Sequence, residues 1–535
     1  MNSEKVQKIY NGITGINEDI IEDAQCFQPK KKVRSWVKWS TAAACLCLVV
    51  WGVYGVSRLG LIGRMGIAPG STSGENRGGE GSTYMSYAGP VFPMSALNAG
   101  DTLMAERNVN YDFSPYETFT KSYEANGETR SYESYTSQSI VTDSYVLTNS
   151  GKEEQIVTLV YPFAASLSDD LEVLPTITVD GETVQAALHI GPYSGAYEGA
   201  FDSSSDFSAD MSETLNLAEL NSWEKYKALL GTDYQTRAFD ALPMLTQPAV
   251  VYEISDMYGE RSKEAAAPTL NMEFAIDYDK TAILTFGFNG FTNDRTTGYC
   301  ARDLFISPKG SIDYGESAYL IVLGDDIGEY TLGAYVNGAC EKKMENAGGT
   351  VTRYETTLGE IIAIAAKQYL SHYQSVNSGE SVDILSTIPE DTFVGLAAEL
   401  LCDCGMLSKA PVMRYDTGML EEVFQDSLYM GRVMYLTFTV TLPADGSVEA
   451  VSQMAKEASM DFRGASKGRN GYDMVTRLGS SLTFTGQTAS VSNTENIEIL
   501  RHNFGFDLEN EITKVELDLA QEHYYLEVRR VAPNR

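Results

Sequence analysis

The chain contains one segment with the spacing of a serine hydrolase. Residues 464–468 (Gly-Ala-Ser-Lys-Gly) match the G-x-S-x-G pattern, in which a sharp strand-to-helix turn exposes the serine as a nucleophile. His502 and His523 follow Ser466 in the chain, so the order suits a Ser–His pair. Residues 469–471 (Arg-Asn-Gly) continue the segment as a loop, however, and no strand-turn-helix pattern surrounds it. We interpret the segment as a polar loop between strands and predict no catalytic residue and no enzymatic activity.

Residue types that bind metals or cofactors are present without the spacing that such groups need. Residues 277–279 and 324–326 are rich in Asp but do not reproduce a twelve-residue calcium loop. Cys402 and Cys404 form a C-x-C pair without a second cysteine pair or a nearby histidine. The sequence has no phosphate-binding glycine loop and no dinucleotide fingerprint. No histidine is paired at a zinc-ligand spacing; the four are His189, His372, His502 and His523. The sequence therefore predicts no metal site and no cofactor.

An uncharged apolar run near the N-terminus predicts where the rest of the chain lies. Residues 41–56 carry no charge, and about 20 apolar residues are needed to cross a bilayer. Trp36 suits the interface on one side, and residues 59–62 continue the apolar pattern past Arg58, whose side chain can reach the headgroups. We predict a transmembrane helix over residues 39–62. The residues expected to anchor it are Trp39, Ala42, Leu46, Val49, Trp51, Val53 and Tyr54.

A basic cluster precedes this helix and predicts its orientation. The cluster consists of Lys30, Lys31, Lys32, Arg34 and Lys38. Only Arg58 and Arg64 follow the apolar run closely on its other side. The positive-inside rule therefore places residues 1–38 in the cytoplasm and the remaining chain outside. The predicted localisation is the cell membrane, crossed once.

Two other targeting patterns compete with an uncleaved anchor. A cleaved signal peptide would also have a basic region before an apolar core. Its nearest small-x-small site, residues 66–68, is followed by Pro69, which disfavours cleavage. A lipoprotein would need its cysteine after the apolar core, whereas Cys45 lies near the start of it. The uncleaved anchor fits these residues best.

The charge of the chain is divided unevenly on the two sides of the predicted helix. The 535 residues carry a net charge of −33. Residues 1–65 hold nine Lys and Arg against five Asp and Glu, a net charge of +4. The remaining residues hold 31 against 68, a net charge of −37. An exterior this acidic repels nucleic acid and anionic lipid headgroups. The expected partners are the membrane and an unidentified extracytoplasmic ligand.

The cysteines outside the predicted helix allow a disulfide. Cys300, Cys340, Cys402 and Cys404 lie in the predicted exterior, and four cysteines permit three sets of pairings. We expect Cys300 to pair with Cys340. With so few cysteines in a chain that is 43% hydrophobic, the apolar cores must hold the fold.

The chain pattern predicts a mainly β fold with helical insertions, similar to β-sandwiches. Strands are expected at residues 139–148 and 155–161, joined as a hairpin, and at residues 176–179 and 183–188, joined by Asp180-Gly181. Further strands are expected at residues 281–288, 318–323, 432–442, 482–492, 497–500 and 515–528. Helices are expected at residues 223–230, at residues 358–373 after a Thr357/Glu360 capping box, and at residues 390–404.

These patterns divide the chain into six regions. They are a cytoplasmic segment (1–38), the transmembrane helix (39–62), a Gly/Ser-rich linker (63–100), a β-rich region (101–349), a mostly helical region (350–430) and a C-terminal β-rich region (431–535). The cytoplasmic segment has apolar residues at helical spacing between Val6 and Ile21. Thirty-eight residues bury little core by themselves, so we expect this segment to dock a partner.

The N-terminus resembles that of clostridial single-pass membrane proteins. The resemblance covers residues 13–24 (Ile-Thr-Gly-Ile-Asn-Glu-Asp-Ile-Ile-Glu-Asp-Ala), the basic run, Trp39 and residues 42–46. Such segments are likened to anti-sigma factors, which implies a cytoplasmic helix that holds a sigma factor. The zinc-binding version of that family needs a His and paired Cys, and Cys26 stands alone here. Residues 145–149 and 161–163 also resemble strands of exported β-sandwich regions.

Together these features predict a membrane-anchored protein rather than an enzyme. We expect the exported β-rich region to bind or sense an extracytoplasmic ligand at the surface of a Gram-positive anaerobe. The alternative is transmembrane signalling, in which the cytoplasmic helix acts as an anti-sigma factor.

Overall fold

The computed structural model describes most of the chain after residue 87. The described residues are 88–97, 102–116, 118–125, 128–193, 242–307, 317–377, 382–407, 417–460, 468–477 and 480–531, together with Gly100 and Tyr415. The predicted transmembrane helix, its basic flank and the expected helix at residues 223–230 lie outside them. Within the described ranges no helix is long and apolar enough to span a bilayer.

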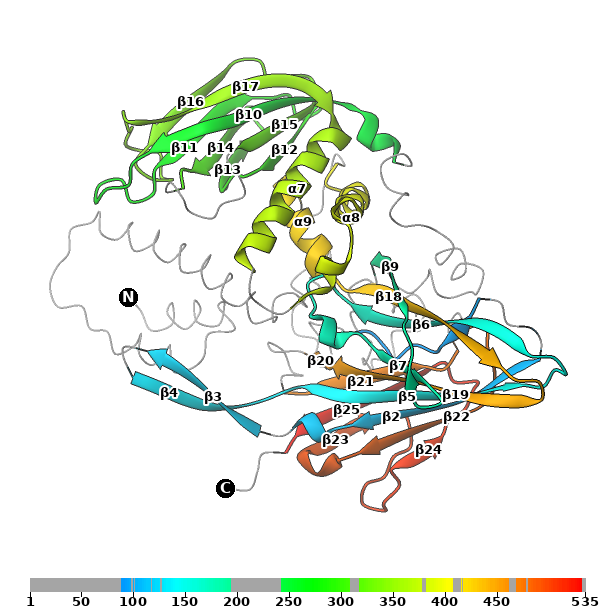
Figure 1. Cartoon of the computed structure of the whole chain (residues 1–535). Coiled ribbons are helices and arrows are strands. Elements are labelled where there is room, and N and C mark those ends of the chain that lie inside the picture. The colour runs from blue at the N-terminus through cyan, green and yellow to red at the C-terminus, as the bar shows by residue number, and fades with distance from the viewer. Residues whose placement is uncertain are drawn as a thin grey trace.

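The described residues form a mainly β structure with several antiparallel sheets and three α-helices, which confirms the predicted class (Figure 1). Residues 88–193 and 432–531 together form one β-rich part, here called the terminal body. The described residues between 248 and 357 form a second part. It is here called the inserted sandwich, because in the sequence it lies between the two segments of the terminal body. The helices lie between these two parts (Figure 1).

The terminal body contains three main sheets. Their strand orders are β24-β22-β2-β5-β19-β7-β8, β1-β6-β18-β9 and β20-β21-β25-β23. Strands from its first segment are β1 (Ser95–Ala96), β2 (Leu103–Asp112), β5 (Gln138–Asn149), β6 (Gln155–Ala165), β7 (Thr176–Val179), β8 (Glu182–Thr183) and β9 (Ala187–Tyr193). Strands from its second segment are β18 (Arg432–Leu442), β19 (Gly446–Glu457), β20 (Ser459–Met460), β21 (Asn470–Val475), β22 (Thr483–Ser492), β23 (Ile497–His502), β24 (Lys514–Glu516) and β25 (His523–Arg530). A separate two-stranded ribbon pairs β3 (Thr118–Ala125) with β4 (Glu128–Tyr135).

The expected hairpin of β5 and β6 is wrong, although both strands exist. β5 pairs with β2 and β19, whereas β6 pairs with β1 and β18, so the chain crosses from one sheet to another at residues 150–154. Both strands bury alternate apolar side chains in the same core, including Tyr145 on β5 and Tyr161 on β6. A turn sequence alone does not reveal whether the two strands it joins pair with each other or lie in different sheets. The other expected hairpin is confirmed at its turn, where β7 pairs with β8. Asp180 and Gly181 both have positive φ, as its turn requires. The second strand expected at residues 183–188 is wrong in extent, because β8 covers only Glu182–Thr183 and Ala187 begins β9, which pairs with β18.

The inserted sandwich packs two four-stranded sheets against each other. One sheet has the order β12 (Thr281–Phe286), β15 (Ala318–Gly324), β10 (Pro248–Gly259) and β17 (Ala347–Thr357). The other, here called the outer sheet, has the order β13 (Gly290–Asp294), β14 (Tyr299–Phe305), β11 (Thr269–Ala275) and β16 (Tyr330–Tyr335). Side chains from both sheets share one buried core, among them Ile254, Leu320, Met272 and Phe274.

Three helices connect the inserted sandwich to the terminal body. They are α7 (Leu358–Val376), α8 (Glu390–Asp403) and α9 (Leu420–Tyr429). The predicted Thr357/Glu360 capping box opens α7, and α8 ends before Gly405, which has a φ of 79°. The Phe424 ring of α9 packs on Phe286 of β12. Backbone hydrogen bonds such as Leu385 N–H to Leu167 O (2.8 Å) tie the helical region to the terminal body.

Short 3₁₀ turns complete the described elements. They are η1 (Ser114–Tyr116), η2 (Leu171–Val173), η4 (Pro243–Thr246), η5 (Ile384–Thr387) and η7 (Thr494–Asn496). Among the sequence predictions, β18 has the predicted bounds, whereas the strand expected at residues 515–528 is divided into β24 and β25.

Candidate functional site on the outer sheet

The outer sheet presents a polar and aromatic surface away from the sandwich core. On β11, Leu270, Met272 and Phe274 point into the core, so Asn271 and Glu273 point to the opposite face. On β14, Cys300 and Leu304 lie in the core, so Tyr299 and Asp303 share the face of Glu273. Tyr335 of β16 joins them because it pairs with Thr269. These five side chains, Asn271, Glu273, Tyr299, Asp303 and Tyr335, are here called the acidic aromatic face.

The register of three strands brings this face together. Asn271 of β11 lies opposite Asp303 on β14 and opposite Gly333 on β16. Glu273 lies two residues further along β11, opposite Thr331 of β16. Opposite residues in antiparallel strands have Cβ atoms about 5 Å apart, so the side chains contact each other. The face therefore depends on pairing between segments that are about 30 to 60 residues apart in the chain.

Hydrogen bonds from neutral donors fix both carboxylates. Tyr299 Oη donates to Glu273 Oε1 at 2.9 Å, and Thr331 Oγ1 donates to Glu273 Oε2 at 3.4 Å. Asn271 Nδ2 donates to Asp303 Oδ1 at 2.7 Å. The Cys340 thiol approaches the same oxygen at 3.5 Å. Among the described residues no Lys or Arg forms an ion pair with either carboxylate, so the face keeps its negative charge.

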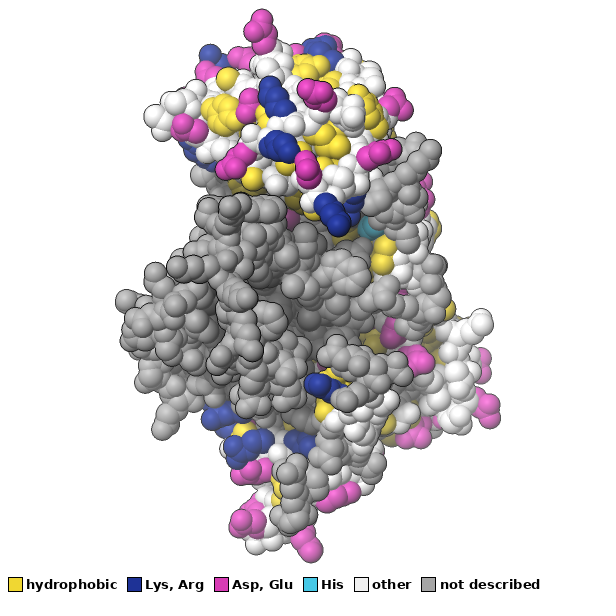
Figure 2. Space-filling model, turned by 90° about the vertical axis from the view of Figure 1, so that its left-hand side faces the viewer, with side chains coloured by type: hydrophobic (Ala, Val, Ile, Leu, Met, Phe, Trp, Pro, Cys, Tyr) yellow, Lys and Arg dark blue, Asp and Glu magenta, His cyan; other side chains and the backbone are white. Residues whose placement is uncertain are grey.

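Two glycines allow aromatic rings to lie close to the backbone beside this face. A Cβ added to Gly333 would lie 2.7 Å from Cε2 of Tyr335, so this ring lies against the glycine. A Cβ added to Gly338 would lie 3.1 Å from Cε1 of Phe305. Tyr299 is 38% exposed and Phe305 is 40% exposed, so ring surface remains open to a ligand. Figure 2 shows hydrophobic side chains interspersed with charged ones on the visible surface of the inserted sandwich.

The two phenols of the face and the neighbouring Cys340 thiol have raised pKa values and so stay protonated. Burial, together with the hydrogen bond to Glu273, raises the pKa of Tyr299 to about 12. Burial and the charge of Asp303 raise the pKa of the Cys340 thiol to about 12. Burial and the charge of Glu273 also raise the pKa of Tyr335. A thiol and phenols with such pKa values are poor nucleophiles at neutral pH. The Cys340 thiol and the Tyr299 hydroxyl are therefore protonated at neutral pH.

The expected Cys300–Cys340 disulfide is not present, and both cysteines are free. Cys300 points into the sandwich core, where its sulfur lies 3.1 Å from Tyr278 Oη. Cys340 contacts Asp303, whose side chain lies on the opposite face of β14. The sheet itself therefore separates the two sulfur atoms. Sequence spacing could not reveal this separation, because it depends on which face of β14 each cysteine meets.

The other sequence-selected residues that the structure describes lie in separate surroundings. Ser466 lies outside the described residues, and His523 is buried with its Nε2 2.9 Å from Asp473 Oδ2. Asp277 pairs with Lys280, and Asp326 pairs with Arg353. In the part of the chain that the structure describes, no three His, Cys, Asp or Glu residues gather as metal ligands do.

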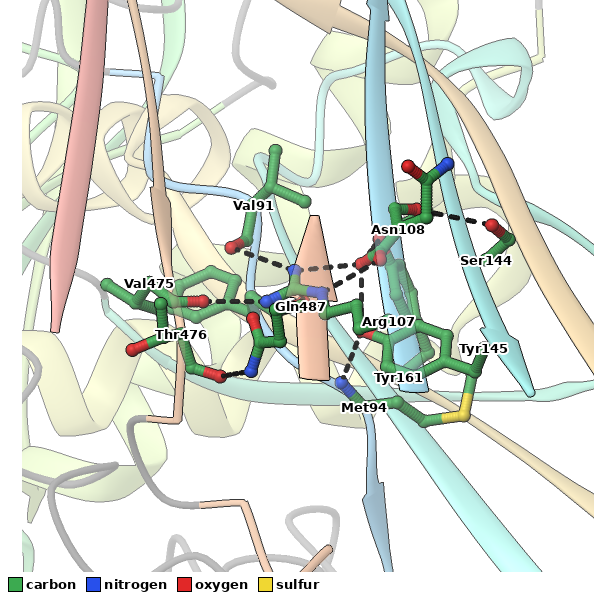
Figure 3. Close-up of polar contacts among 12 residues, drawn as sticks. Val91, Met94, Arg107, Asn108, Ser144, Tyr145, Tyr161, Val475, Thr476 and Gln487 are labelled. Carbon is green, nitrogen blue, oxygen red and sulfur yellow. Dashed lines mark hydrogen bonds and ion pairs between the residues drawn. The ribbon is translucent and has the colours of Figure 1, made fainter. Parts of the chain in front are cut away.

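A second polar cluster, inside the terminal body, has a structural role (Figure 3). Arg107 of β2 donates through Nε and Nη2 to both carboxylate oxygens of Asp143 on β5, at 2.8 and 2.9 Å. Its Nη1 donates to Val475 O at 2.7 Å, and Tyr145 Oη donates to Asp143 Oδ2 at 2.9 Å. Arg107 is only 2% exposed and Asp143 is fully buried. The cluster leaves no surface for a ligand and instead joins β2, β5 and β21.

Burial disfavours the charged forms of Arg107 and Asp143, whereas their mutual attraction favours these forms. Burial works against the Arg107 guanidinium, yet the adjacent Asp143 carboxylate raises the pKa of Arg107. Burial raises the pKa of Asp143, and the hydrogen bonds from Arg107 and Tyr145 oppose that rise. The two-point geometry favours the ionised pair.

The described residues thus define a mainly β protein with an acidic and aromatic surface on its inserted sandwich. No family model, curated protein or solved structure matches this chain.

Proposed function

We propose that this chain is a non-enzymatic, single-pass membrane protein whose β-rich part binds or senses a ligand outside the cell. The observation that carries the proposal is the acidic aromatic face. Its carboxylates are fixed by cross-strand hydrogen bonds, and its aromatic surface is exposed. A surface fixed before binding loses less conformational entropy when a ligand arrives.

The position outside the cell follows from the N-terminal sequence. The uncharged run at residues 41–56 and the preceding basic cluster support an uncleaved anchor with residues 1–38 in the cytoplasm. The net charge of −37 after residue 65 suits an exported protein that stays soluble at a cell surface.

The raised pKa values of the phenol and the thiol at this face support a binding role. Cys340 is the thiol nearest the face, and its raised pKa keeps it protonated. The Tyr299 hydroxyl donates a hydrogen bond to Glu273 and does not act as a base there.

The experiment uses intact Gram-positive cells that express the full chain with one epitope tag at each end. Protease added outside should remove the C-terminal tag and leave the N-terminal tag intact until the cells are lysed. Protection of the C-terminal tag in intact cells would contradict the proposed topology. Release of product from a cell-wall, glycan or ester substrate by the purified full chain would contradict the non-enzymatic role.

A second candidate function is signalling by an anti-sigma-like cytoplasmic helix. It is favoured by the apolar residues at helical spacing between Val6 and Ile21. Affinity capture with the full chain in detergent should then recover a sigma factor, and replacing Ile13 and Ile16 by Asp should abolish the recovery. Capture that is unchanged by these substitutions would argue against this candidate.

A further inference from the structure

The hydrogen-bonding capacity that remains on the acidic aromatic face consists mostly of acceptors. The hydroxyl hydrogens of Tyr299 and Thr331 point at Glu273, so their oxygens are left to accept. The carboxylates of Glu273 and Asp303 can only accept while ionised. A ligand that fits this face must therefore donate more hydrogen bonds than it accepts.

Asn271 adds a separate observation at the base of the face. The residue is only 5% exposed, and its Oδ1 has no hydrogen-bond partner among the described residues. The orientation of this amide is fixed, because Asp303 accepts and so requires the Asn271 nitrogen toward it. A buried acceptor without a partner is unfavourable, because it has lost its hydrogen bonds to water. A donor supplied from outside would offset that cost.

The charge and the aromatic rings point to a cation as the donor. Among the described residues, the side chains that donate hydrogen bonds to Glu273 and Asp303 are neutral: tyrosine, threonine, asparagine and cysteine. The faces of aromatic rings carry partial negative charge and attract cations within about 6 Å. Tyr335 and Tyr299 therefore add to the negative potential of the two carboxylates.

Arginine meets all of these conditions at once. Its guanidinium has five donors and no acceptor, stacks on tyrosine rings, and forms two-point hydrogen bonds with carboxylates. A neutral sugar also stacks on aromatic rings, but each hydroxyl both donates and accepts, so it would leave the excess of acceptors unmatched. An anionic polymer would be repelled by the two carboxylates and by the acidic exterior.

We propose that the acidic aromatic face binds arginine side chains of a basic peptide segment outside the cell. The inference rests on the proposed binding function and names its ligand class. Arginine guanidinium groups would lie between Glu273 and Asp303, against the rings of Tyr299 and Tyr335. The acidic exterior would speed the encounter with such a segment, and added salt would slow it.

The experiment measures binding of a fluorescent hexa-arginine peptide to the full chain in non-ionic detergent micelles. In the test variant Glu273→Gln is combined with Asp303→Asn, which keeps side-chain size and removes two negative charges. We expect its affinity for the peptide to fall about tenfold. The Tyr335→Leu variant should lose about threefold, because leucine keeps an apolar side chain and removes the ring.

A matched control separates this site from general attraction to an acidic protein. Glu260 and Glu345 are exposed on loops of the same sandwich. Replacing both by Gln makes the same change in net charge, and we expect less than a twofold loss of affinity. Equal losses in the two double variants would overturn the proposal, as would a wild-type chain that does not bind the peptide. Melting temperatures of all variants verify that they are folded.

A neutral oligosaccharide, chitohexaose, tests the ligand class in parallel. In one outcome the full chain binds chitohexaose through Tyr299 and fails to bind hexa-arginine. That result would overturn the arginine proposal and leave the binding function of the face intact. The proposed function itself is tested separately, by the protease experiment on topology and by the assay for substrate turnover. Neither experiment depends on the identity of the ligand.

Discussion

The Tyr299 hydroxyl of β14 donates a 2.9 Å hydrogen bond to Glu273 on the neighbouring strand β11. This bond crosses the outer sheet diagonally, because Tyr299 pairs with Ala275 and Glu273 pairs with Ala301. It holds an aromatic ring beside a carboxylate that has no cationic partner among the described residues. The consequence is an ordered, negatively charged surface for which the sandwich core provides the rigid support.

Replacing Gly333 by Val should displace the ring of Tyr335. The added Cβ would lie within 3.1 Å of two ring carbons and the hydroxyl oxygen of Tyr335, so the ring must move off the backbone. We expect hexa-arginine affinity to fall about threefold. The Gly486→Val variant in β22 of the terminal body is a control, because an added Cβ there meets no atom within 4 Å. Unchanged affinity in the Gly333→Val variant, measured by fluorescence anisotropy, would argue against a role for the ring.

Removing Arg107 should strongly destabilise the terminal body. Arg107→Met leaves the buried Asp143 carboxylate without its cation, which costs about 3–5 kcal/mol. The double variant with Asp143→Leu should recover much of this loss, because it no longer buries an unpaired charge. Urea denaturation of the single and double variants measures both effects. Equal stability of Arg107→Met and the wild type would contradict the assigned role.

Glu421 should make stability depend on pH near neutrality. Burial raises the pKa of this carboxyl to about 7, and the carboxyl accepts a hydrogen bond from the Gly287 N–H. In the folded state it therefore binds a proton more tightly than in the unfolded state, whose pKa is near 4.5. Its contribution to stability is complete below pH 4.5 and is lost as the pH rises to about 7.

The Glu421→Gln variant tests this dependence. It should match the wild type at pH 4.5 and exceed its stability by about 3 kcal/mol at pH 8, because glutamine carries no charge to bury. Thermal unfolding at both pH values measures the difference, and Glu345→Gln on an exposed loop is the control. A constant difference between Glu421→Gln and the wild type across this range would contradict the assignment.

The four described cysteines should all react with a thiol reagent after unfolding without reductant. The structure has Cys300, Cys340, Cys402 and Cys404 as free thiols. Alkylation in denaturant followed by mass spectrometry should therefore find modified peptides for Cys300 and Cys340. Recovery of a linked Cys300–Cys340 peptide would require a different packing of β14, because the sheet separates the two sulfurs.

Local sequence patterns predicted individual elements well. The alternation in residues 432–442 predicts β18 with its observed bounds, and the Thr357/Glu360 pair predicts the start of α7. Helix α9 was missed, although Leu420, Val423, Phe424 and Leu428 have helical spacing and are all buried. That signal was available in the sequence.

Pairing between distant strands could not be predicted from the same patterns. β2 lies parallel to β22, about 380 residues later in the chain, and β5 pairs with β19 rather than with β6. The acidic aromatic face has the same origin, since Asn271 meets Asp303 only through the register of β11 and β14. A single residue of slip in that register would turn one of these side chains into the core.

Hydrogen exchange of the full chain, with and without the hexa-arginine peptide, tests most directly whether the outer sheet is the binding surface. The account predicts slower amide exchange confined to β11 (Thr269–Ala275), β14 (Tyr299–Phe305) and β16 (Tyr330–Tyr335), and none of this protection when Glu273→Gln and Asp303→Asn are combined. Protection confined to the terminal body, or protection of the outer sheet that persists in this double variant, would contradict it.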